Sequence, residues 1–387
     1  MLEREVMEFD VVIVGGGPAG LSSACRIMQL AQEQEKEISV CLVEKGSEVG
    51  AHILSGAVVD PIALTELFPN WKEIGAPLNT EVKVDELHWL HDDKVSRQFS
   101  NWMIPKTMHN EGNYVISLGN LCRWLSERAE ELGVEVFPGF TAANVSYDES
   151  GRVEGIITGD MGVAADGSEK DGYMPGMILK AKYTIFAEGC RGHLGKELIQ
   201  RFGLDKKVDP QHYGLGIKEL WDVPAEQSKP GTVIHTAGWP LGKEAGGGGF
   251  LYHLENNQVV VGLITDLNYK NPYLSPYDEF QRYKHHPLIA NHLKGGKRVS
   301  YGARAIAKGG LRSLPEMVFE GGLLVGCDAG TLNPGKIKGT HTAMKTGMLA
   351  AESIVAALGQ ENPPSTLANF TTAFHNSWVG EELRQSR

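Results

Sequence analysis

The sequence lacks several features that would define whole classes of protein. Its five cysteines are scattered, with no C-x-x-C pair and no spacing that indicates a disulfide framework. No run approaches the roughly 18 uncharged apolar residues that would span a bilayer. Basic residues are in deficit, 37 against 48 acidic ones for a formal charge of -11, which disfavours a broad electrostatic grip on nucleic acid or anionic lipid. These absences favour a reducing compartment, and they restrict any membrane contact to a local, apolar one.

Targeting signals and repeats are also missing. Residues 1–5 are acidic and contain no apolar run, so they match neither a signal peptide nor an Arg-rich, acid-poor transit peptide. There is no internal repeat and no low-complexity tail. With 387 residues, 42% of them hydrophobic, the chain exceeds the usual size of one domain, and we expect two interleaved domains.

The first fifty residues carry a β-α-β pattern. Residues 10–14 are a β-branched strand that runs into a glycine turn, and a helical pattern follows as far as the charged stretch 33–37. A second strand is predicted at residues 40–43. Later, an amphipathic helix at residues 118–132 feeds a strand at 134–137. Parallel strands need such crossovers, so the pattern predicts an α/β, doubly wound core.

The middle of the chain predicts antiparallel structure. Residues 153–157 and 178–186 are expected to form a hairpin of a small sheet, joined by a Gly- and Asp-rich surface turn. Residues 215–267 contain strand-like runs around a glycine run at 246–249, which fits a separate antiparallel substrate domain. An alanine-rich helix is predicted at residues 340–358.

A dinucleotide-binding fingerprint occupies the first glycine turn. Residues 11–20 read VVIVGGGPAG, a G-x-G-x-x-G between a strand and a helix. The first glycine allows the tight turn, the second lets the backbone approach a pyrophosphate, and the third allows close packing of helix on strand. The phosphates are then expected at the helix N-terminus. The residues assigned to the dinucleotide are Gly15, Gly17, Pro18, Ala19 and Gly20.

An acidic residue follows at the position that binds the ribose in dinucleotide-binding folds. Glu44 ends the second strand, where a carboxylate accepts hydrogen bonds from both ribose hydroxyls of an adenosine, and Lys45 follows it. A carboxylate there argues against a 2'-phosphate. A glycine turn without a ligand is the alternative, disfavoured by strand, helix and Glu44 together. The fingerprint does not by itself separate NAD from FAD.

Two later segments favour FAD. Residues 321–330, GGLLVGCDAG, resemble the second flavin motif of the glutathione-reductase-like FAD family, which implies that Gly326 and Asp328 bind near the ribityl chain. By its pattern alone, Asp328 is also an ordinary helix cap. Glu188 and Gly189 lie in a segment resembling the turn beside the adenosine in the same family, or simply a strand end.

The helix after the second motif would point its N-terminus at the flavin. That family resemblance implies a start near Gly339 and Thr340, facing the pyrimidine ring of the flavin. Lys336 and Lys338 stand just before it. Positive potential at that edge favours an anionic reduced flavin.

Longer segments narrow the resemblance to one family. They are KIKGTHTAMK at 336–345, GKRVSYGAR at 296–304, NPYLSP at 271–276, KHHP at 284–287 and FAEGC at 186–190. Together they resemble the electron transfer flavoprotein-ubiquinone oxidoreductase family, over nearly the whole chain. The resemblance implies an enzyme that takes electrons singly from reduced electron transfer flavoprotein, holds FAD and a [4Fe-4S] cluster, and reduces ubiquinone at a membrane surface.

The resemblance also implies where quinone and membrane are bound. The quinone contacts it implies are Gly247, Gly248 and Thr340, and the membrane contacts are Trp102, Met103 and Ile104. Taken alone, the glycine run is a plain flexible loop. Trp102 fits the headgroup boundary and an ordinary core equally well.

The cysteines depart from the family pattern. Four thiolates hold a [4Fe-4S] cluster, and the cysteines here lack the spacing, so each is interpreted as a small buried residue and no metal is expected in this chain. We expect the chain to end before a cluster domain. His285 and His286 are adjacent and would point apart on a helix, which favours a surface helix over a metal site.

These inferences combine into one organisation. The predicted parts are an FAD-binding domain at 1–85, 113–192 and 300–358, a ubiquinone-binding, membrane-facing domain at 86–112 and 193–299, and the start of a truncated C-terminal region at 359–387. No acid or base residue is nominated, because FAD carries the redox chemistry. The expected location is the cytoplasmic face of a bacterial inner membrane, as a peripheral protein.

Three alternatives stay open. One is a shorter FAD quinone reductase whose ferredoxin partner is a separate chain, and another is a non-catalytic FAD-binding interaction module. The third is a monooxygenase or isoprenoid reductase of related fold, which NAD(P)H oxidation would reveal. It is disfavoured because only one nucleotide fingerprint is convincing.

Overall fold

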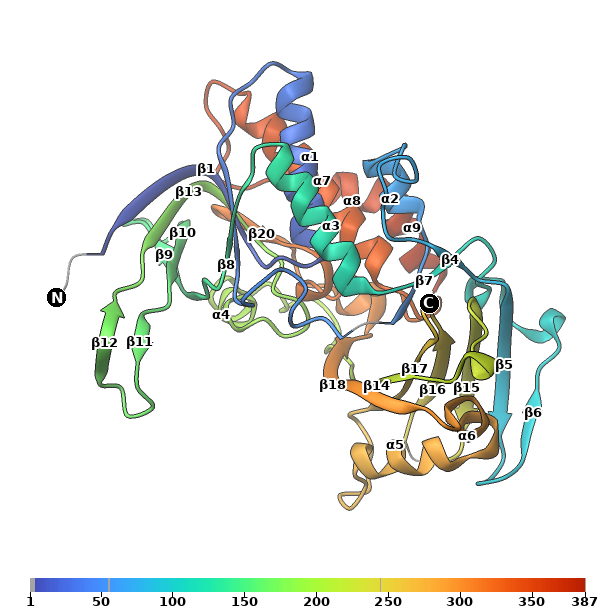
Figure 1. The fold of residues 1–387 in the computed structure, drawn as a ribbon. Helices are drawn as coiled ribbons and strands as arrows, with labels where there is room; N and C mark the ends of the chain where they lie inside the picture. Colours follow the sequence, from blue (N-terminus) through green and yellow to red (C-terminus); the bar gives the residue numbers. More distant parts are fainter. Residues whose placement is uncertain (1–3, 55, 244, 387) are drawn as a thin grey trace.

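Two sheets organise the chain in the computed structural model, which describes residues 4–54, 56–243 and 245–386 (Figure 1). The first sheet has the order β19-β20-β13-β1-β2-β8, and its strands from β20 to β8 run parallel. These strands are β1 (Val6–Val14), β2 (Val40–Glu44), β8 (Glu135–Pro138), β13 (Ile178–Phe186), β19 (Val318–Phe319) and β20 (Gly322–Leu324). The mixed α/β class is therefore confirmed.

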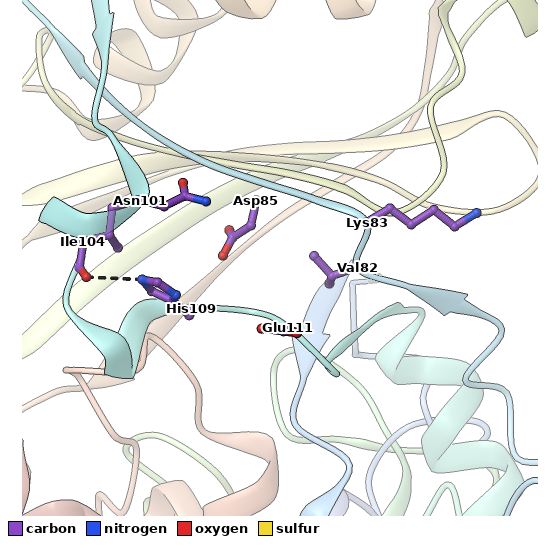
Figure 2. A pocket seen from close by; sticks show the side chains of 7 residues that line it. All are labelled: Val82, Lys83, Asp85, Asn101, Ile104, His109 and Glu111. Carbon is purple, nitrogen blue, oxygen red and sulfur yellow. Dashed lines mark hydrogen bonds between the residues drawn. The ribbon is translucent and has the colours of Figure 1, made fainter.

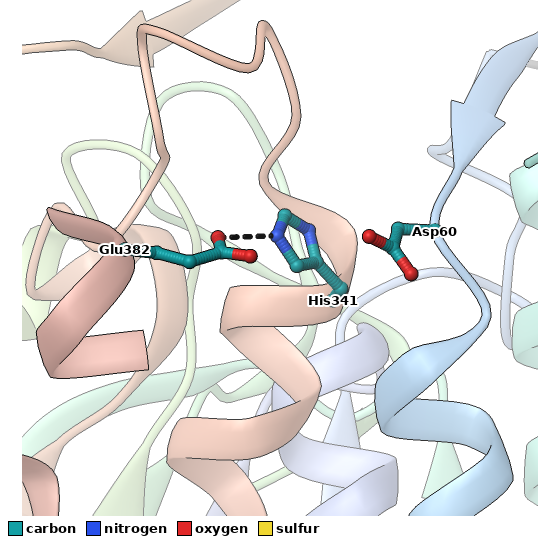
Figure 3. Close-up of side chains that lie close together, drawn as sticks. All are labelled: Asp60, His341 and Glu382. Atoms are coloured by element: carbon teal, nitrogen blue, oxygen red, sulfur yellow. Dashed lines mark hydrogen bonds and ion pairs between the residues drawn. The ribbon is translucent and has the colours of Figure 1, made fainter. Parts of the chain in front are cut away.

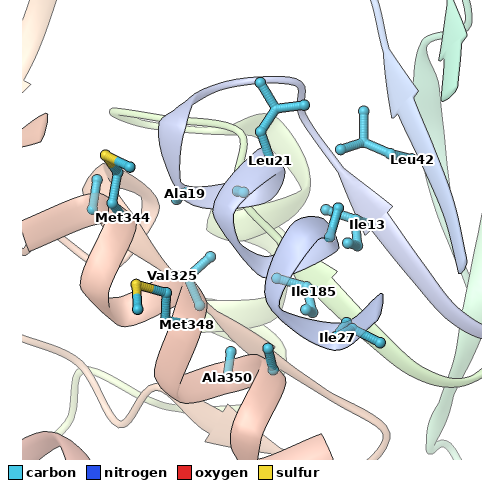
Figure 4. Close-up of a cluster of buried hydrophobic side chains, with 14 of the residues drawn as sticks. Ile13, Ala19, Leu21, Ile27, Leu42, Ile185, Val325, Met344, Met348 and Ala350 are labelled. Carbon is cyan, nitrogen blue, oxygen red and sulfur yellow. The ribbon is translucent and has the colours of Figure 1, made fainter. Parts of the chain in front are cut away.

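Three helices lie together on this sheet: α1 (Pro18–Glu33), α3 (Leu118–Glu131) and α7 (Thr340–Leu358). Figure 4 shows the buried apolar side chains that join α1 and α7 to the strands, among them Ile13, Leu21 and Met348. At Gly347, α7 packs tightly against α1, since a Cβ there would lie 2.2 Å from the carbonyl oxygen of Ala19. Fully burying a side chain such as Ile13 contributes about 1.5–3 kcal/mol.

The predicted small sheet around β13 is wrong. β10 (Val153–Thr158) does pair antiparallel with β13, but β13 is a central strand of the first sheet, between β1 and β20. Its last four residues are buried, as expected for a strand covered on both faces. The Gly- and Asp-rich segment forms its own hairpin, β11 (Met161–Val163) and β12 (Glu169–Met174), which stands away from the rest (Figure 1).

The second sheet has the order β18-β14-β17-β16-β15-β5-β6, antiparallel except where β15 meets β5. Its strands are β5 (Val84–Leu90), β6 (Ser96–Gln98), β14 (Tyr213–Asp222), β15 (Thr232–Gly238), β16 (Gly247–His253), β17 (Gln258–Asp266) and β18 (Lys297–Ala307). Phe280 and Tyr283 of α5 (Pro276–His285) are fully buried in the core of this sheet, together with Ile289 of α6 (Pro287–Leu293). Both segments of the predicted quinone-binding domain contribute strands, and β18 extends beyond residue 299. The domain boundaries themselves stay a prediction.

His285 ends α5 and is exposed, as expected, but His286 does not lie on a helix surface, so the expectation was wrong for that residue. It is buried between α5 and α6, and its Nδ1 accepts a hydrogen bond of 3.1 Å from the backbone N–H of Leu288. Its ring packs against Trp239. Pro287 ends α5 and begins α6, so His286 becomes the N-cap of the second helix.

The remaining elements connect and flank the two sheets. They are β3 (Ala57–Val59), α2 (Ile62–Leu67), β4 (Thr80–Glu81), η1 (Asn101–Met103), η2 (Lys106–Met108), β7 (Tyr114–Ile116), β9 (Ala142–Tyr147), α4 (His193–Phe202), η3 (Ala225–Gln227), η4 (Gly310–Ser313), η5 (Gly326–Asp328), α8 (Ala368–Asn376) and α9 (Trp378–Gln385). Of these, β9 belongs to the first sheet through its pairing with β10, and β3, β7 and β4 form a separate small sheet. Among the described residues, no helix combines the length and apolarity needed to cross a membrane.

Candidate functional site

The glycine turn between β1 and α1 has the geometry of an anion site. Gly15 has a φ of +108°, and a Cβ there would lie 2.5 Å from the carbonyl oxygen of Ala187. A Cβ on Gly20 would lie 2.1 Å from the carbonyl oxygen of Gly15. At Gly17, by contrast, a Cβ would meet no atom of residues 4–54, 56–243 or 245–386 within 4 Å. The tight positions thus require glycine for the fold, and Gly17 leaves open space in front of the helix.

The first turn of α1 is open to a negatively charged group. Among the described residues, no side chain caps its N-terminus; its first turn contains no acidic residue, and Pro18 and Ala19 begin the helix. Helix N-termini carry unpaired N–H groups and a partial positive charge. The turn therefore fits the pyrophosphate of a dinucleotide.

Glu44 is held in position by the backbone. The backbone N–H of Gly16 donates to its Oε2 over 2.9 Å, and that of Gly46 donates to its Oε1 over 2.7 Å. A carboxylate oxygen can accept more than one hydrogen bond, so both oxygens can still bind ribose hydroxyls. Lys45 is exposed beside it.

The structure brings Glu188 and Asp328 together. The backbone N–H of Glu188 lies 3.3 Å from Oδ2 of Asp328, at the ends of β13 and β20. Burial raises the pKa of Asp328 well above its ordinary value, and the nearby Glu188 carboxylate adds to the rise. Asp328 is the last residue of η5, whose N-cap is Val325, and the N-cap of α7 is Gly339. Asp328 therefore begins neither helix, and its interpretation as an ordinary helix cap was wrong.

The Glu188 side chain has a partner that the sequence did not indicate. Its Oε2 accepts a hydrogen bond of 2.8 Å from the backbone N–H of Gly195, and its Oε1 lies 3.2 Å from Nδ1 of His193. Both partners belong to the first turn of α4. Glu188 thus stabilises the start of α4, next to Gly189, which has a φ of +83°. Gly326 packs against α1, where its Cβ would lie 2.9 Å from Cβ of Ala19.

The start of α7 is a second open helix N-terminus. Gly339 is its N-cap, and no side chain in the described part of the protein caps it; the first turn begins with Thr340 and contains no acidic residue. Lys338, just before it, is 5% exposed, and its ammonium donates to the carbonyl oxygen of Lys336 over 3.2 Å. Burial lowers the pKa of Lys338 to about 8, and the Lys336 charge adds to this. Burial lowers the pKa of His235 on β15 to about 4, and the nearby charge of Lys338 adds to this. The turn before α7 therefore faces the second sheet.

The glycine run proposed for quinone is not a flexible loop. Gly247 and Gly248 begin β16 and pair with Thr265 and Ile264 of β17. Gly247 has a φ of +135°, and its Cβ would lie 2.0 Å from the carbonyl oxygen of Ile264. A Cβ on Gly248 would lie 2.5 Å from the carbonyl oxygen of Thr236. Strand pairing therefore requires these glycines, and the loop alternative was wrong.

The segment proposed to face a membrane is exposed. Trp102 is 85% exposed and Met103 is 51% exposed, on η1, while Ile104 is half-buried. The alternative that Trp102 closes a core is therefore wrong. A cavity of about 320 Å³ opens beside Ile104, and Figure 2 shows that its side chains are mainly polar. The lining residues are Val82, Lys83, Asp85, Asn101, Ile104, His109 and Glu111.

A second cavity lies next to the flavin motif. It has a volume of about 540 Å³ and is lined by residues of α4 and η4 together with Arg191, Cys327 and Asp328. Cys190 and Cys327 are half-buried, whereas Cys25, Cys41 and Cys122 are buried as expected. Burial raises the pKa of each of these three thiols to about 12.

One possible metal site was missed by sequence reasoning. Within the described part of the chain, Asp60, His341 and Glu382 present ligand atoms within 4.8 Å of one another. They come from three distant segments, and no local spacing signals their meeting. The ammonium of Lys336 lies between the two carboxylates, 3.2 Å from Oδ2 of Asp60 and in contact with Oε1 of Glu382. The place of a cation is therefore already taken by a lysine.

Comparison with known families identifies two regions. Residues 213–306 match the family described as ETF-QO, ubiquinone-binding, and residues 13–71 match the NAD(P)-binding Rossmann-like domain. Among solved structures, a geranylgeranyl bacteriochlorophyll reductase-like protein from Thermoplasma acidophilum has a TM-score of 0.72 at 18% identity, over 98% of this chain and 86% of that one. The flavin-dependent brominase Bmp2 has a TM-score of 0.65 at 16% identity, over 97% of this chain and 84% of that one. These two likenesses concern the fold alone.

Full-length relatives share much more sequence. The electron transfer flavoprotein-ubiquinone oxidoreductase of Pseudomonas aeruginosa is 64% identical over 100% of this chain and 70% of its own length. The mitochondrial protein of that name from Homo sapiens is 52% identical over 100% of this chain and 63% of its own length. The resemblance seen in the sequence is confirmed, and the chain belongs to the electron transfer flavoprotein-ubiquinone oxidoreductase family.

Proposed function

We propose that this chain is the FAD- and quinone-binding part of an oxidoreductase that passes electrons from reduced electron transfer flavoprotein to ubiquinone. The observation that carries the proposal is the identity of 64% over the whole chain, including the region 213–306 matched as ubiquinone-binding. The open N-terminus of α1 adds support, because it suits a dinucleotide on the same molecule.

FAD would lie along the carboxyl ends of the first sheet, in a glutathione-reductase-like, doubly wound arrangement. FAD supplies the redox chemistry, accepting and donating electrons. The residues assigned to it are Gly15, Gly17, Pro18, Ala19, Gly20, Glu44, Lys45, Glu188, Gly189, Gly326, Asp328, Gly339 and Thr340. The α1 N-terminus would bind phosphate, Glu44 would orient the ribose, Asp328 would bond the ribityl chain, and α7 would direct its positive end toward the flavin ring.

Quinone would bind on the second sheet, against Gly247, Gly248 and Thr340. The missing side chains of the two glycines are explained by strand pairing, so their backbone groups would be the polar contacts of the quinone. Trp102, Met103 and Ile104 would rest in the headgroup region as a peripheral contact. A bacterial inner membrane, at its cytoplasmic face, is the proposed location.

A [4Fe-4S] cluster does not fit the cysteines described here. Such a cluster needs four thiolates, whereas three of the five thiols are buried in the core with raised pKa values. We therefore assign the cluster to the rest of a longer protein. This chain spans 70% of the P. aeruginosa relative and 63% of the human one.

The test is an anaerobic assay of the purified chain. The visible spectrum is recorded first, and then the reduction of a soluble ubiquinone analogue by the chemically reduced protein. A flavin spectrum with quinone turnover is expected. Bound flavin without quinone turnover would favour a non-catalytic FAD-binding module, and turnover that appears only with an added ferredoxin would favour a relative whose partner is separate.

A matched measurement addresses the related flavin enzymes. NAD(P)H is added under the same conditions and its oxidation is followed. No oxidation is expected, because the chain carries one nucleotide fingerprint. Rapid oxidation would favour a monooxygenase or isoprenoid reductase instead. Absence of bound flavin would contradict the proposed function, because that function requires FAD.

A further inference from the structure

The charged cluster at the start of α7 links three distant segments (Figure 3). Asp60 follows β3, His341 is the second residue of α7, and Glu382 lies on α9. His341 is fully buried, and its Nε2 lies 3.0 Å from Oε2 of Glu382. Figure 3 shows the imidazole between the two carboxylates.

Lys336 makes this cluster an internal ion-pair network. Burial alone would lower the pKa of Lys336, but its hydrogen bond to Glu382 and the charges of Glu382 and Asp60 outweigh burial and raise the pKa. The lysine stays charged at neutral pH. A divalent ion would have to displace that ammonium, so the cluster is not proposed as a metal site.

Glu382 holds the turn that precedes α7. The turn closes on itself through a hydrogen bond of 2.9 Å from the N–H of Asn333 to the carbonyl oxygen of Lys338. Glu382 accepts from Nδ2 of Asn333 over 3.1 Å, from the ammonium of Lys336, and from His341. Burial alone would raise the pKa of Glu382, yet the hydrogen bonds from His341 and Lys336 lower it to about 2. The carboxylate is therefore ionised whenever the protein is at neutral pH.

A second residue of α9 supports the same place. The Trp378 ring stacks on the His341 ring, with centroids 5.6 Å apart and planes at 7°. Its Nε1 donates to Glu66 over 2.7 Å, and Glu66 also pairs with Lys345 of α7 over 2.6 Å. Thus α9 contacts both the turn and the first turns of α7.

We propose that Glu382 is a positioning residue of the flavin site, which fixes the turn 333–341 and balances the charge of Lys336 at the start of α7. The proposal rests on the proposed function, because the N-terminus of α7 is the end assigned to the flavin ring. The carboxylates of Asp60 and Glu382 offset the ammonium groups of Lys336 and Lys338 at this turn. Removing one carboxylate makes the local potential more positive, and positive potential stabilises an anionic reduced flavin.

The test measures the midpoint potential of the bound flavin by anaerobic spectroelectrochemical titration. Glu382→Gln should shift the potential to more positive values, and Lys336→Met should shift it to more negative ones. Each shift is expected to be at least tenfold in the ratio of reduced to oxidised flavin at a fixed applied potential, about 30 mV for a two-electron couple. A structural role alone would not produce shifts of opposite sign.

The matched control is Glu381→Gln. It makes the same chemical change one position earlier on α9, where the carboxylate is paired with Arg384 and Gln385 on the exposed side. Its flavin potential should equal that of the unmodified protein. The FAD content and the far-UV circular dichroism of every variant are recorded alongside.

The outcomes separate this proposal from the function on which it rests. If both variants bind FAD and keep the control's potential, or shift it in the same direction, the positioning role is overturned and FAD binding stands. If Glu382→Gln folds but loses FAD while Glu381→Gln keeps it, the positioning role is supported, and Lys336→Met then decides the charge balance. If the unmodified protein binds no FAD, the proposed function is overturned first.

Discussion

At the scale of single residues, the glycine turn separates what the fold needs from what the ligand needs. Ala at position 20 would place a Cβ 2.1 Å from the Gly15 carbonyl oxygen, whereas Ala at position 17 would point into open space. Overpacking of this kind costs about 1–3 kcal/mol. We predict that Gly20→Ala lowers the free energy of unfolding of the FAD-free protein by that amount and abolishes FAD binding.

Gly17→Ala is the paired variant. It should leave the unfolding free energy of the FAD-free protein nearly unchanged and weaken FAD binding at least tenfold, because its methyl group occupies the pyrophosphate space. Urea denaturation without FAD and fluorescence titration with FAD measure the two quantities. Equal loss of stability in both variants would contradict the division of roles.

The buried histidines predict an acid-sensitive stability. Burial lowers the pKa of His253 to about 3, and the adjacent His292, with Nδ1 2.9 Å from His253 Nε2, adds to the lowering. An unfolded histidine has a pKa of about 6.5, so below that pH the unfolded chain binds a proton that the folded chain excludes. Stability is therefore retained above pH 6.5 and lost as the pH falls toward about 3.

His253→Gln tests this sign. The unmodified protein should lose about 2 kcal/mol of unfolding free energy from this histidine between pH 6.5 and pH 5. The variant should be less stable at pH 7, but its unfolding free energy should fall by about 2 kcal/mol less than that of the unmodified protein over the same pH range. Urea denaturation at the two pH values gives the change in unfolding free energy for each protein. An equal change in both proteins would show that His253 titrates alike in the folded and unfolded chain, and would contradict the prediction.

At the scale of elements, the sequence was most informative where caps and periodicity coincide. The helix predicted at 340–358 is α7, Thr340–Leu358, because Gly339 and Gly359 mark its ends. The partner of β13 was harder to assign, since a Gly- and Asp-rich connection resembles a simple hairpin whichever sheet the strand joins. Only the burial of β13 on both faces distinguishes a central parallel strand from an edge.

The β11–β12 hairpin is predicted to be dispensable for folding. A two-stranded ribbon is marginally stable by itself, and this one stands apart from both cores. At its base, Asp160 accepts from Arg4 over 2.6 Å and from the N–H of Gly176 over 2.7 Å. Replacing residues 162–173 by a short turn, with Asp160 and Gly176 kept, should change the melting temperature by only a few degrees.

FAD content of that deletion variant provides the second measurement. It should equal that of the full chain, because the assigned flavin residues lie on other elements. The control is a variant with the same length of hairpin but with its charged side chains replaced by serine. Loss of FAD from the deletion alone would show that the hairpin contacts the flavin site.

At the scale of the whole molecule, the charge distribution makes a specific prediction about membranes. With a formal charge of -11, the chain should bind vesicles through apolar contact and not through electrostatic attraction. Trp102→Ser with Met103→Ser should strongly reduce co-flotation with lipid vesicles. Binding of the unmodified protein should change little between low and high salt, whereas a steep loss with salt would contradict an apolar contact.

Tyr273→Ser is the matched control for this experiment. Tyr273 is 93% exposed, more than Trp102, and lies in the loop before α5. Its replacement should leave flotation unchanged. A loss as large as that of the Trp102 variant would show that exposed aromatic residues act collectively, without a dedicated membrane segment.

The site as a whole was only partly predictable. The glycines and the strand-end carboxylates of the site can be recognised from local sequence, because their spacing reflects one turn and one helix. The Asp60, His341 and Glu382 cluster comes from segments that meet only after the first sheet and its helices are complete. No local pattern encodes such a meeting. The same holds for the pairing of Glu188 with the start of α4, which the strand-end pattern did not indicate.

The strand order of the first sheet also governs how the chain must emerge from the ribosome. β1 gains β2 on one side early, but its other neighbour, β13, begins only at Ile178. At roughly 5–20 residues per second, the open side of β1 waits on the order of ten seconds for that partner. An unpaired apolar strand edge is a template for aggregation. Expression yield should therefore depend on chaperones that shield nascent chains during this interval, independently of the stability of the finished protein.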